Sequence, residues 1–133
     1  MKPDYERAET KADQIIKQYG TICPLTILKR TPGVLVSSYS ETSEETGIDR
    51  QNLLTMFGEH DQDAFTTAYV ENCKTKYLVM YNKQLTCQET RFALARELGH
   101  IVLGHDGTRP EETRNEEAVC FAQHLLAELD GET

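Results

Sequence analysis

The N-terminal part of the chain carries an apolar stripe of helical spacing, followed by short and more polar segments. Apolar residues recur at every third or fourth position from Tyr5 to Tyr19, and Gly20 follows directly, as expected at the end of an amphipathic helix. Pro24 suits the first turn of a second, short helix. This part therefore predicts helices over residues 4–19 and 23–31, a strand over 34–39, a polar loop over 40–47 and a short helix over 49–57.

The C-terminal part has stronger signals. Two β-rich runs, residues 64–70 and 76–81, are separated by a connection of hairpin length. Thr86 and Glu89 have the spacing of a capping box, which predicts a long helix from residue 86 to about residue 103. An apolar face predicts a last helix over residues 111–129. The pattern predicts an α+β fold with N-terminal helices, a small antiparallel three-stranded sheet and two packed C-terminal helices.

Composition and charge narrow the class of protein. A length of 133 residues suits a single domain covering residues 1–133. The longest strongly apolar run is residues 101–103, too short for a membrane span, and the N-terminus has no signal-peptide pattern. The net charge of -8 argues against direct binding of nucleic acid. The four cysteines are widely spaced, which favours reduced thiols and a cytoplasmic protein.

The candidate chemistry lies on the helix predicted over residues 86–103. Zinc peptidases with a His-Glu-x-x-His helix place two imidazoles one turn apart, where they can share a metal, and a glutamate beside them that activates water. Glu97 and His100 occupy the second and fourth of these positions, but Arg96 stands where the first histidine would be. Because a guanidinium has no acceptor and does not deprotonate in proteins, Arg96 cannot replace imidazole as a ligand.

The C-terminal third resembles the ImmA/IrrE-type zinc metallopeptidases, whose members include repressor-cleaving proteins of phages and mobile elements. Two segments carry the resemblance: Arg91-Phe92-x-Leu94-Ala95-x-Glu97-Leu98-Gly99-His100 and Glu117-Ala118-x-x-Phe121-Ala122-x-x-Leu125-Leu126. The likeness is specific over about residues 76–129. It implies a minimal zincin-like domain.

The resemblance also implies residue roles. His100 would be a zinc ligand, Glu97 the base that activates water, and Glu117 or Glu116 the third ligand, with the Glu-Ala alignment favouring Glu117. Asn115 replaces an earlier glutamate of the family pattern, so that zinc binding would be weakened or lost. The strand over residues 76–82 would be an edge strand lining a substrate cleft, with Leu78, Val79 and Met80 beside the substrate.

Two interpretations of Arg96 remain open. It could replace the charge of a lost metal by pairing with Glu97, Glu116 and Glu117, or it could be an exposed helix residue. His105 would be a poor metal partner for His100 on a continuing helix, although Gly104 could end the helix before it.

The resemblance implies a cytoplasmic protein that acts on a protein partner, such as a helix-turn-helix repressor. The leading interpretation is a degenerate metallopeptidase that binds its partner without cutting it. The alternatives are an active zinc peptidase with a rearranged ligand set and a non-catalytic sensor domain. The sequence does not specify an oligomeric state.

Overall fold

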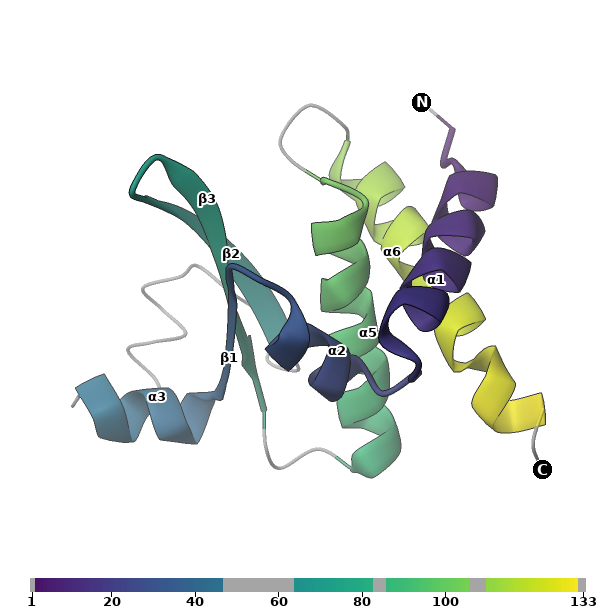
Figure 1. Cartoon of the computed structure of the whole chain (residues 1–133). Helices are drawn as coiled ribbons and strands as arrows, with labels where there is room; N and C mark the ends of the chain where they lie inside the picture. The colour runs from purple at the N-terminus through teal and green to yellow at the C-terminus, as the bar shows by residue number, and fades with distance from the viewer. Residues whose placement is uncertain (1, 47–63, 83–85, 106–109, 132–133) are drawn as a thin grey trace.

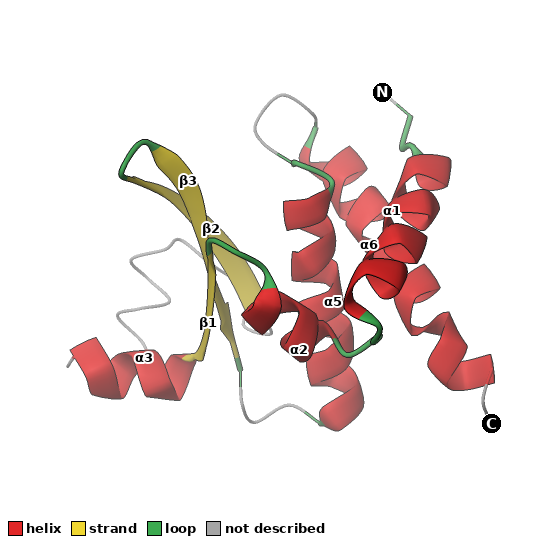
Figure 2. Ribbon diagram, viewed as in Figure 1, coloured by secondary structure: helices red, strands yellow, loops and turns green. Residues whose placement is uncertain are grey.

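The computed structural model describes residues 2–46, 64–82, 86–105 and 110–131, which form an α+β fold. The elements are α1 (Tyr5–Tyr19), α2 (Pro24–Arg30), β1 (Val34–Ser38), α3 (Tyr39–Thr46), β2 (Ala64–Glu71), β3 (Lys74–Tyr81), α5 (Cys87–Val102) and α6 (Glu111–Gly131). The sheet forms one layer, α5 lies against it, and α6 and α1 pack on the far side of α5 (Figures 1 and 2). None of the described helices has the length and apolar character needed to cross a membrane.

Local signals in the sequence explain where the long helices begin and end. The Asp4 side chain accepts a hydrogen bond from the backbone N–H of Arg7 at 3.0 Å, and Gly20 closes α1 with a φ of 67°. At the start of α5, the predicted capping box is present. The Thr86 hydroxyl accepts from the backbone N–H of Glu89, and the Glu89 carboxylate accepts from that of Thr86, both at 3.1 Å.

The sheet is mixed, whereas the sequence pattern predicted an antiparallel one. β2 and β3 form the predicted antiparallel hairpin, but β1 pairs with β3 in parallel, with Val34 opposite Tyr77 and Ser38 opposite Tyr81. A long connection that includes α3 separates β1 from the hairpin in the chain. Such a connection lets β1 and β3 run in the same direction, which a short turn could not do.

β3 is the middle strand, and its prediction as an edge strand was wrong. The strand order is β1-β3-β2, so both sides of β3 are already paired within the described residues. Val79 and Met80 are fully buried and Leu78 is half-buried, which leaves no free backbone edge on β3 for a substrate. In the described sheet the edges are β1 and β2.

A helix replaces the loop that was predicted over residues 40–47. α3 follows β1 directly, and Tyr39 at its start is 1% exposed and packs with Met80. The Ser38 hydroxyl accepts a hydrogen bond from the backbone N–H of Glu41 at 3.1 Å, as a helix cap does. Packing at Tyr39 and this cap stabilise a segment whose own sequence is polar. The helix predicted over residues 49–57 lies outside the described residues.

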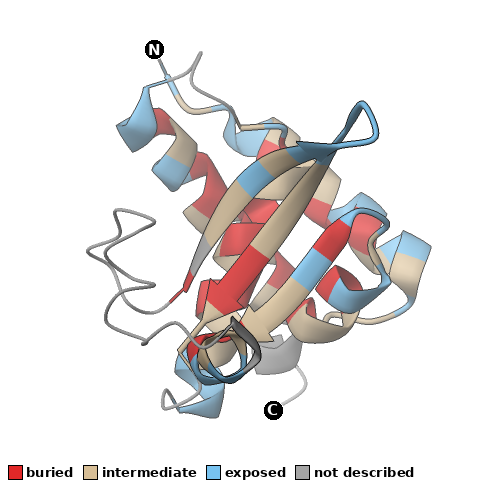
Figure 3. Cartoon of the chain, turned by 90° about the vertical axis from the view of Figure 1, so that its left-hand side faces the viewer, coloured by how far each residue is buried: buried red, intermediate tan, exposed pale blue. Residues whose placement is uncertain are grey.

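The main core lies between the sheet and the helices, and Figure 3 shows buried positions beneath the strands, while the β2–β3 turn is exposed. Gly99 allows α5 and α6 to approach closely. A Cβ atom at this position would lie 3.1 Å from Phe121 Cδ1 and 3.3 Å from Ala118 Cα. Phe121 and Ala118 are fully buried. The sequence Leu98-Gly99-His100 therefore serves the packing of the two helices as well as the site.

Candidate functional site

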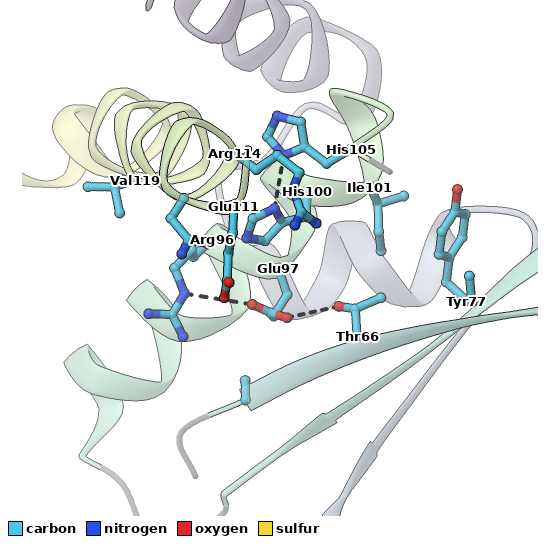
Figure 4. Close-up of a pocket in the computed structure, with 13 residues that line it drawn as sticks. Thr66, Tyr77, Arg96, Glu97, His100, Ile101, His105, Glu111, Arg114 and Val119 are labelled. Carbon is cyan, nitrogen blue, oxygen red and sulfur yellow. Dashed lines mark hydrogen bonds and ion pairs between the residues drawn. The ribbon is translucent and has the colours of Figure 1, made fainter. Parts of the chain in front are cut away.

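A cavity of about 440 Å³ lies between the sheet, α5 and α6. The residues that matter most here are Thr66, Arg96, Glu97, His100 and Arg114, and we call this space the central cavity (Figure 4). Thr66 comes from β2, Arg114 from α6 and the other three from one face of α5. The helical spacing of positions 96, 97 and 100 thus brings Arg96, Glu97 and His100 to one wall of the cavity.

The carboxylate of Glu97 contacts Thr66 and Arg96. The residue is 6% exposed, and its Oε1 accepts a hydrogen bond from the Thr66 hydroxyl at 3.1 Å. Its Oε2 lies 3.6 Å from Arg96 Nε (Figure 4). Contact with a guanidinium stabilises the charged form of a carboxylate that is largely removed from water. The carboxylate that the resemblance assigns to water activation is therefore engaged in an ion pair.

Arg96 lies over Glu97 and does not extend into bulk solvent, since its side chain is 22% exposed. The charge-replacement interpretation named three carboxylates around Arg96. Of these, Glu97 makes an ion pair with Arg96 in the structure. Glu117 instead pairs with a histidine, and exposed Glu116 accepts a hydrogen bond from the Tyr5 hydroxyl at 3.0 Å.

A second histidine joins the site where the helix ends. Gly104, with a φ of 66°, terminates α5, and the backbone N–H of His105 donates to the carbonyl of His100 at 3.0 Å. This turn places His105 Nδ1 2.9 Å from His100 Nδ1. The expectation that His105 would be a poor partner assumed a continuing helix. Gly104 is the position at which the sequence allowed the helix to end before His105, and the chain leaves α5 there.

Glu117 anchors this histidine pair from α6. Its Oε1 lies 2.9 Å from His105 Nε2, and its Oε2 accepts a hydrogen bond from the backbone N–H of Asp4 at 2.7 Å. Glu117 is 1% exposed, as is the His105 side chain. The result is a continuous row of hydrogen bonds from the start of α1 through Glu117 and His105 to His100. Sequence reasoning did not find the part played by Asp4, because its backbone N–H carries no signal in the sequence.

This row of hydrogen bonds determines which ring nitrogens of His100 and His105 carry a proton. A carboxylate only accepts hydrogen bonds, so His105 Nε2 must donate to Glu117. When His105 is neutral, its Nδ1 therefore accepts from His100 Nδ1–H, and His100 Nε2 carries a lone pair. Burial, the largest cause, and then the positive charges of a protonated His105, of Arg96 and of Arg114 together lower the pKa of His100 from 6.5 to about 4. His100 is therefore neutral near pH 7.

The sequence was compared with known protein families, with curated proteins and with solved structures. The family model of the IrrE N-terminal-like domain, a family of peptidases, matches residues 48–129. The chain belongs to this family. No curated protein and no solved structure gave a match. The IrrE N-terminal-like match covers β2, β3, α5 and most of α6, and Asp4 extends the row of hydrogen bonds beyond it.

Members of this family are typically zinc-dependent peptidases, so we tested whether the donors present fit zinc. In the described part of the chain, no three His, Cys, Asp or Glu side chains form a group that could hold a metal ion. Arg96 supplies no lone pair for a metal, while His105 and Glu117 are hydrogen-bonded to each other. As arranged, the described residues of this IrrE N-terminal-like domain do not fit a resident zinc ion.

The two carboxylates proposed as the third ligand face different surroundings. Glu117 is buried beside His105, whereas Glu116 is exposed and contacts Tyr5. Asn115, at the position of the earlier family glutamate, is also exposed and lines the central cavity. Consecutive residues of a helix point about 100° apart, which explains why neighbouring glutamates are placed so differently.

Proposed function

We propose that this metallopeptidase-like domain binds a segment of a protein partner in the central cavity and does not hydrolyse it. The observation that carries the proposal is the Arg96–Glu97 ion pair at 3.6 Å, formed at the position of a metal ligand. A general base must reach the proton it removes. Each oxygen of Glu97 has a contact, one with the Thr66 hydroxyl and one with the Arg96 guanidinium, and the positive charge beside the carboxylate makes it a weaker base, which supports a binding role over a hydrolytic one.

The position of β2 supports a polypeptide as the ligand. β2 pairs with β3 along one side, and it forms an edge of the described sheet. Its alternate residues Ala64, Thr66 and Ala68 line the central cavity. An extended segment could add to such an edge through main-chain hydrogen bonds and place its side chains in the cavity.

The partner we propose is a repressor-type regulatory protein with a helix-turn-helix domain, as the family resemblance suggests. The acidic charge of -8 is compatible with a basic partner. Co-purification of the domain with such a repressor, followed by analysis for cleavage products, would separate binding from hydrolysis. An intact, co-purified repressor is the expected result. A cleaved one would refute the proposal in favour of an active peptidase with a rearranged ligand set.

The decisive measurement is zinc per chain, by elemental mass spectrometry, on protein purified without a chelator or a metal-affinity tag. We expect a value near zero that persists after dialysis against zinc. A value near one in the unmodified chain would refute the proposal.

Two variants test whether Arg96 is the reason why the domain does not bind zinc. Arg96→His would place a second imidazole one turn from His100, and we expect it to gain zinc. Arg91→His adds the same side chain to α5 outside the central cavity and is the matched control, which should gain none. Equal zinc uptake by both variants would mean that added histidine binds zinc unspecifically and that Arg96 does not control the site.

A further inference from the structure

Hydrogen bonds fix both polar groups of one peptide unit in the turn that follows α5. This peptide unit joins Leu103 to Gly104, whose φ is 66°. Its N–H donates to the Ile101 carbonyl at 3.1 Å. Its carbonyl oxygen accepts a hydrogen bond from Arg7 Nη2, on α1, at 2.8 Å. The turn is therefore fixed on one side by α5 itself and on the other by α1.

Helix geometry explains why the Leu103 carbonyl takes a partner from another element. The N–H groups that follow α5 donate to the carbonyls of Ile101 and His100, as in a Schellman motif, and the motif offers no donor to the Leu103 carbonyl. Leu103 is 3% exposed, and a buried carbonyl without a donor is costly. Arg7 supplies the donor, and its positive charge suits the negative end of the helix dipole.

We propose that Arg7 is a positioning residue of the central cavity. By fixing the peptide unit between Leu103 and Gly104, it sets the direction in which the chain leaves α5. This direction places His105 Nδ1 2.9 Å from His100 Nδ1. Arg7 acts through the turn and is not among the described residues that line the cavity. The role does not depend on whether the domain binds or cleaves its partner.

The first turn of α1 reaches the site at a second point as well. The backbone N–H of Asp4 donates to Glu117 Oε2 at 2.7 Å, and the Asp4 side chain accepts from the backbone N–H of Arg7 at 3.0 Å. Figure 1 shows the start of α1 at the same end of the fold as the end of α5. One helical turn thus fixes both the carboxylate that binds His105 and the turn that carries it. Because Asp4 and Arg7 precede residues 48–129, the family match does not indicate either anchor.

The attachment of α1 to the rest of the fold depends mainly on other residues. α1 packs chiefly on α6, and its buried residues are Ala8, Ala12 and Ile15. Removing the Arg7 guanidinium leaves this packing in place. We therefore expect the loss of Arg7 to act locally, at the turn after α5, and to leave the domain folded.

Arg7→Met and Lys11→Met are a matched pair of variants of the full chain. Each removes one cation from the same face of α1, since the two positions lie one helical turn apart. Of the two, only Arg7 bonds to the Leu103 carbonyl in the described part of the chain. The first readout is amide hydrogen exchange at His105, whose N–H bond to His100 closes the turn. We expect exchange there to become about tenfold faster in Arg7→Met and to change by less than about twofold in Lys11→Met.

The second readout is the imidazole ¹⁵N spectrum at pH 8, which a contact that only stabilises the fold would not change. Once the turn is released, His105 Nδ1 no longer stays within reach of His100 Nδ1. Both Nδ1 shifts should then move towards the averaged value of an imidazole that exchanges between its tautomers. Arg7→Lys keeps a charged donor and should restore most of both signals. If Arg7→Met does not fold, Arg7→Gln, which keeps donors on a shorter side chain, takes its place.

The expected result is faster exchange confined to the turn, altered ring shifts, and recovery of both in Arg7→Lys. Unchanged ring shifts and unchanged exchange at His105 in folded Arg7→Met would overturn the positioning role. Equal effects of the two Met variants would also overturn it, because the cause would then be the loss of charge from α1. Exchange that accelerates by the same factor at His105 and at Ala122, in the middle of α6, would overturn it too, because that pattern reports destabilisation of the whole fold.

Discussion

Replacing Glu117 by glutamine should reverse the tautomers of the two histidines. The backbone N–H of Asp4 can only donate, so the glutamine oxygen must face it. The glutamine NH₂ group then faces His105 Nε2, which has to become an acceptor. His105 would carry its proton on Nδ1 and donate to His100 Nδ1, and the His100 proton would move to Nε2.

The energetic cost can be worked from the two hydrogen bonds. Both now end on a carboxylate, and such bonds contribute about 1.5–3 kcal/mol, against about 0.5–1.5 kcal/mol for neutral pairs. Loss of roughly 1 kcal/mol at each bond gives a decrease of about 2 kcal/mol in the free energy of unfolding. For a domain of this size that corresponds to a melting temperature lower by about 6 °C.

Glu116→Gln is the matched control, because Glu116 is the neighbouring glutamate and is exposed. Its contact with the Tyr5 hydroxyl survives the change, and surface contacts of this kind contribute little, so we expect stability to change by less than about 0.5 kcal/mol.

The assay is the ¹⁵N spectrum of the imidazole rings at pH 8, together with thermal unfolding. In the unmodified domain, His100 Nε2 should show the shift of a nitrogen with a lone pair, and in Glu117→Gln that of a protonated nitrogen. Unchanged ring shifts in a folded Glu117→Gln variant would refute the derived proton positions. Equal destabilisation by the two Gln variants would refute the special role of buried Glu117.

Three further predictions concern the same region. Arg96→Gln should lower the free energy of unfolding by about 1–2 kcal/mol, because it breaks the largely buried ion pair with Glu97. Urea unfolding of this variant, of Glu97→Gln and of the double variant measures the coupling energy between the two residues. A coupling energy of zero would disprove the prediction. The free energy of unfolding should fall as the pH drops from 6.5 towards 4, because unfolding lets His100 bind a proton that the fold disfavours. The loss is at most about 3 kcal/mol. An equal pH dependence in His100→Gln would show that this loss does not come from His100. Gly99→Ala should destabilise the fold by about 1–2 kcal/mol although alanine has the better helix propensity, because the new Cβ meets Phe121 at 3.1 Å. In calorimetry, adding Phe121→Leu should restore part of the lost stability. An unchanged melting temperature for the single variant would contradict tight packing between α5 and α6.

Sequence periodicity was sufficient for elements whose stabilising signals are local. α1, α2, α5, α6 and the β2–β3 hairpin were predicted from apolar spacing, caps and connection length. α3 was missed because its polar sequence is stabilised by Tyr39, a contact that exists only after folding. The direction and position of β1 depend on a long connection, and no local pattern encodes its pairing with the middle strand.

The candidate site, too, could be predicted only where local helical spacing determines it. Helical spacing placed Glu97 and His100 on one wall, and the Glu-Ala alignment pointed to Glu117 over Glu116. The bond from His105 to Glu117 was not predictable from spacing, because the chain reverses at Gly104 and brings together residues of different elements. The anchor at Asp4 uses a backbone group, which every residue except proline offers equally.

The packing of α1 against α6 also matters during synthesis of the chain. The apolar stripe of α1, formed by Ala8, Ala12 and Ile15, has its main partner in an element that the ribosome makes only after the sheet and α5. Until α6 has emerged, this stripe faces water or a chaperone. The row of hydrogen bonds that reaches Asp4 runs through Glu117 of α6, so the histidines of the central cavity cannot reach their final arrangement before α6 has been synthesised.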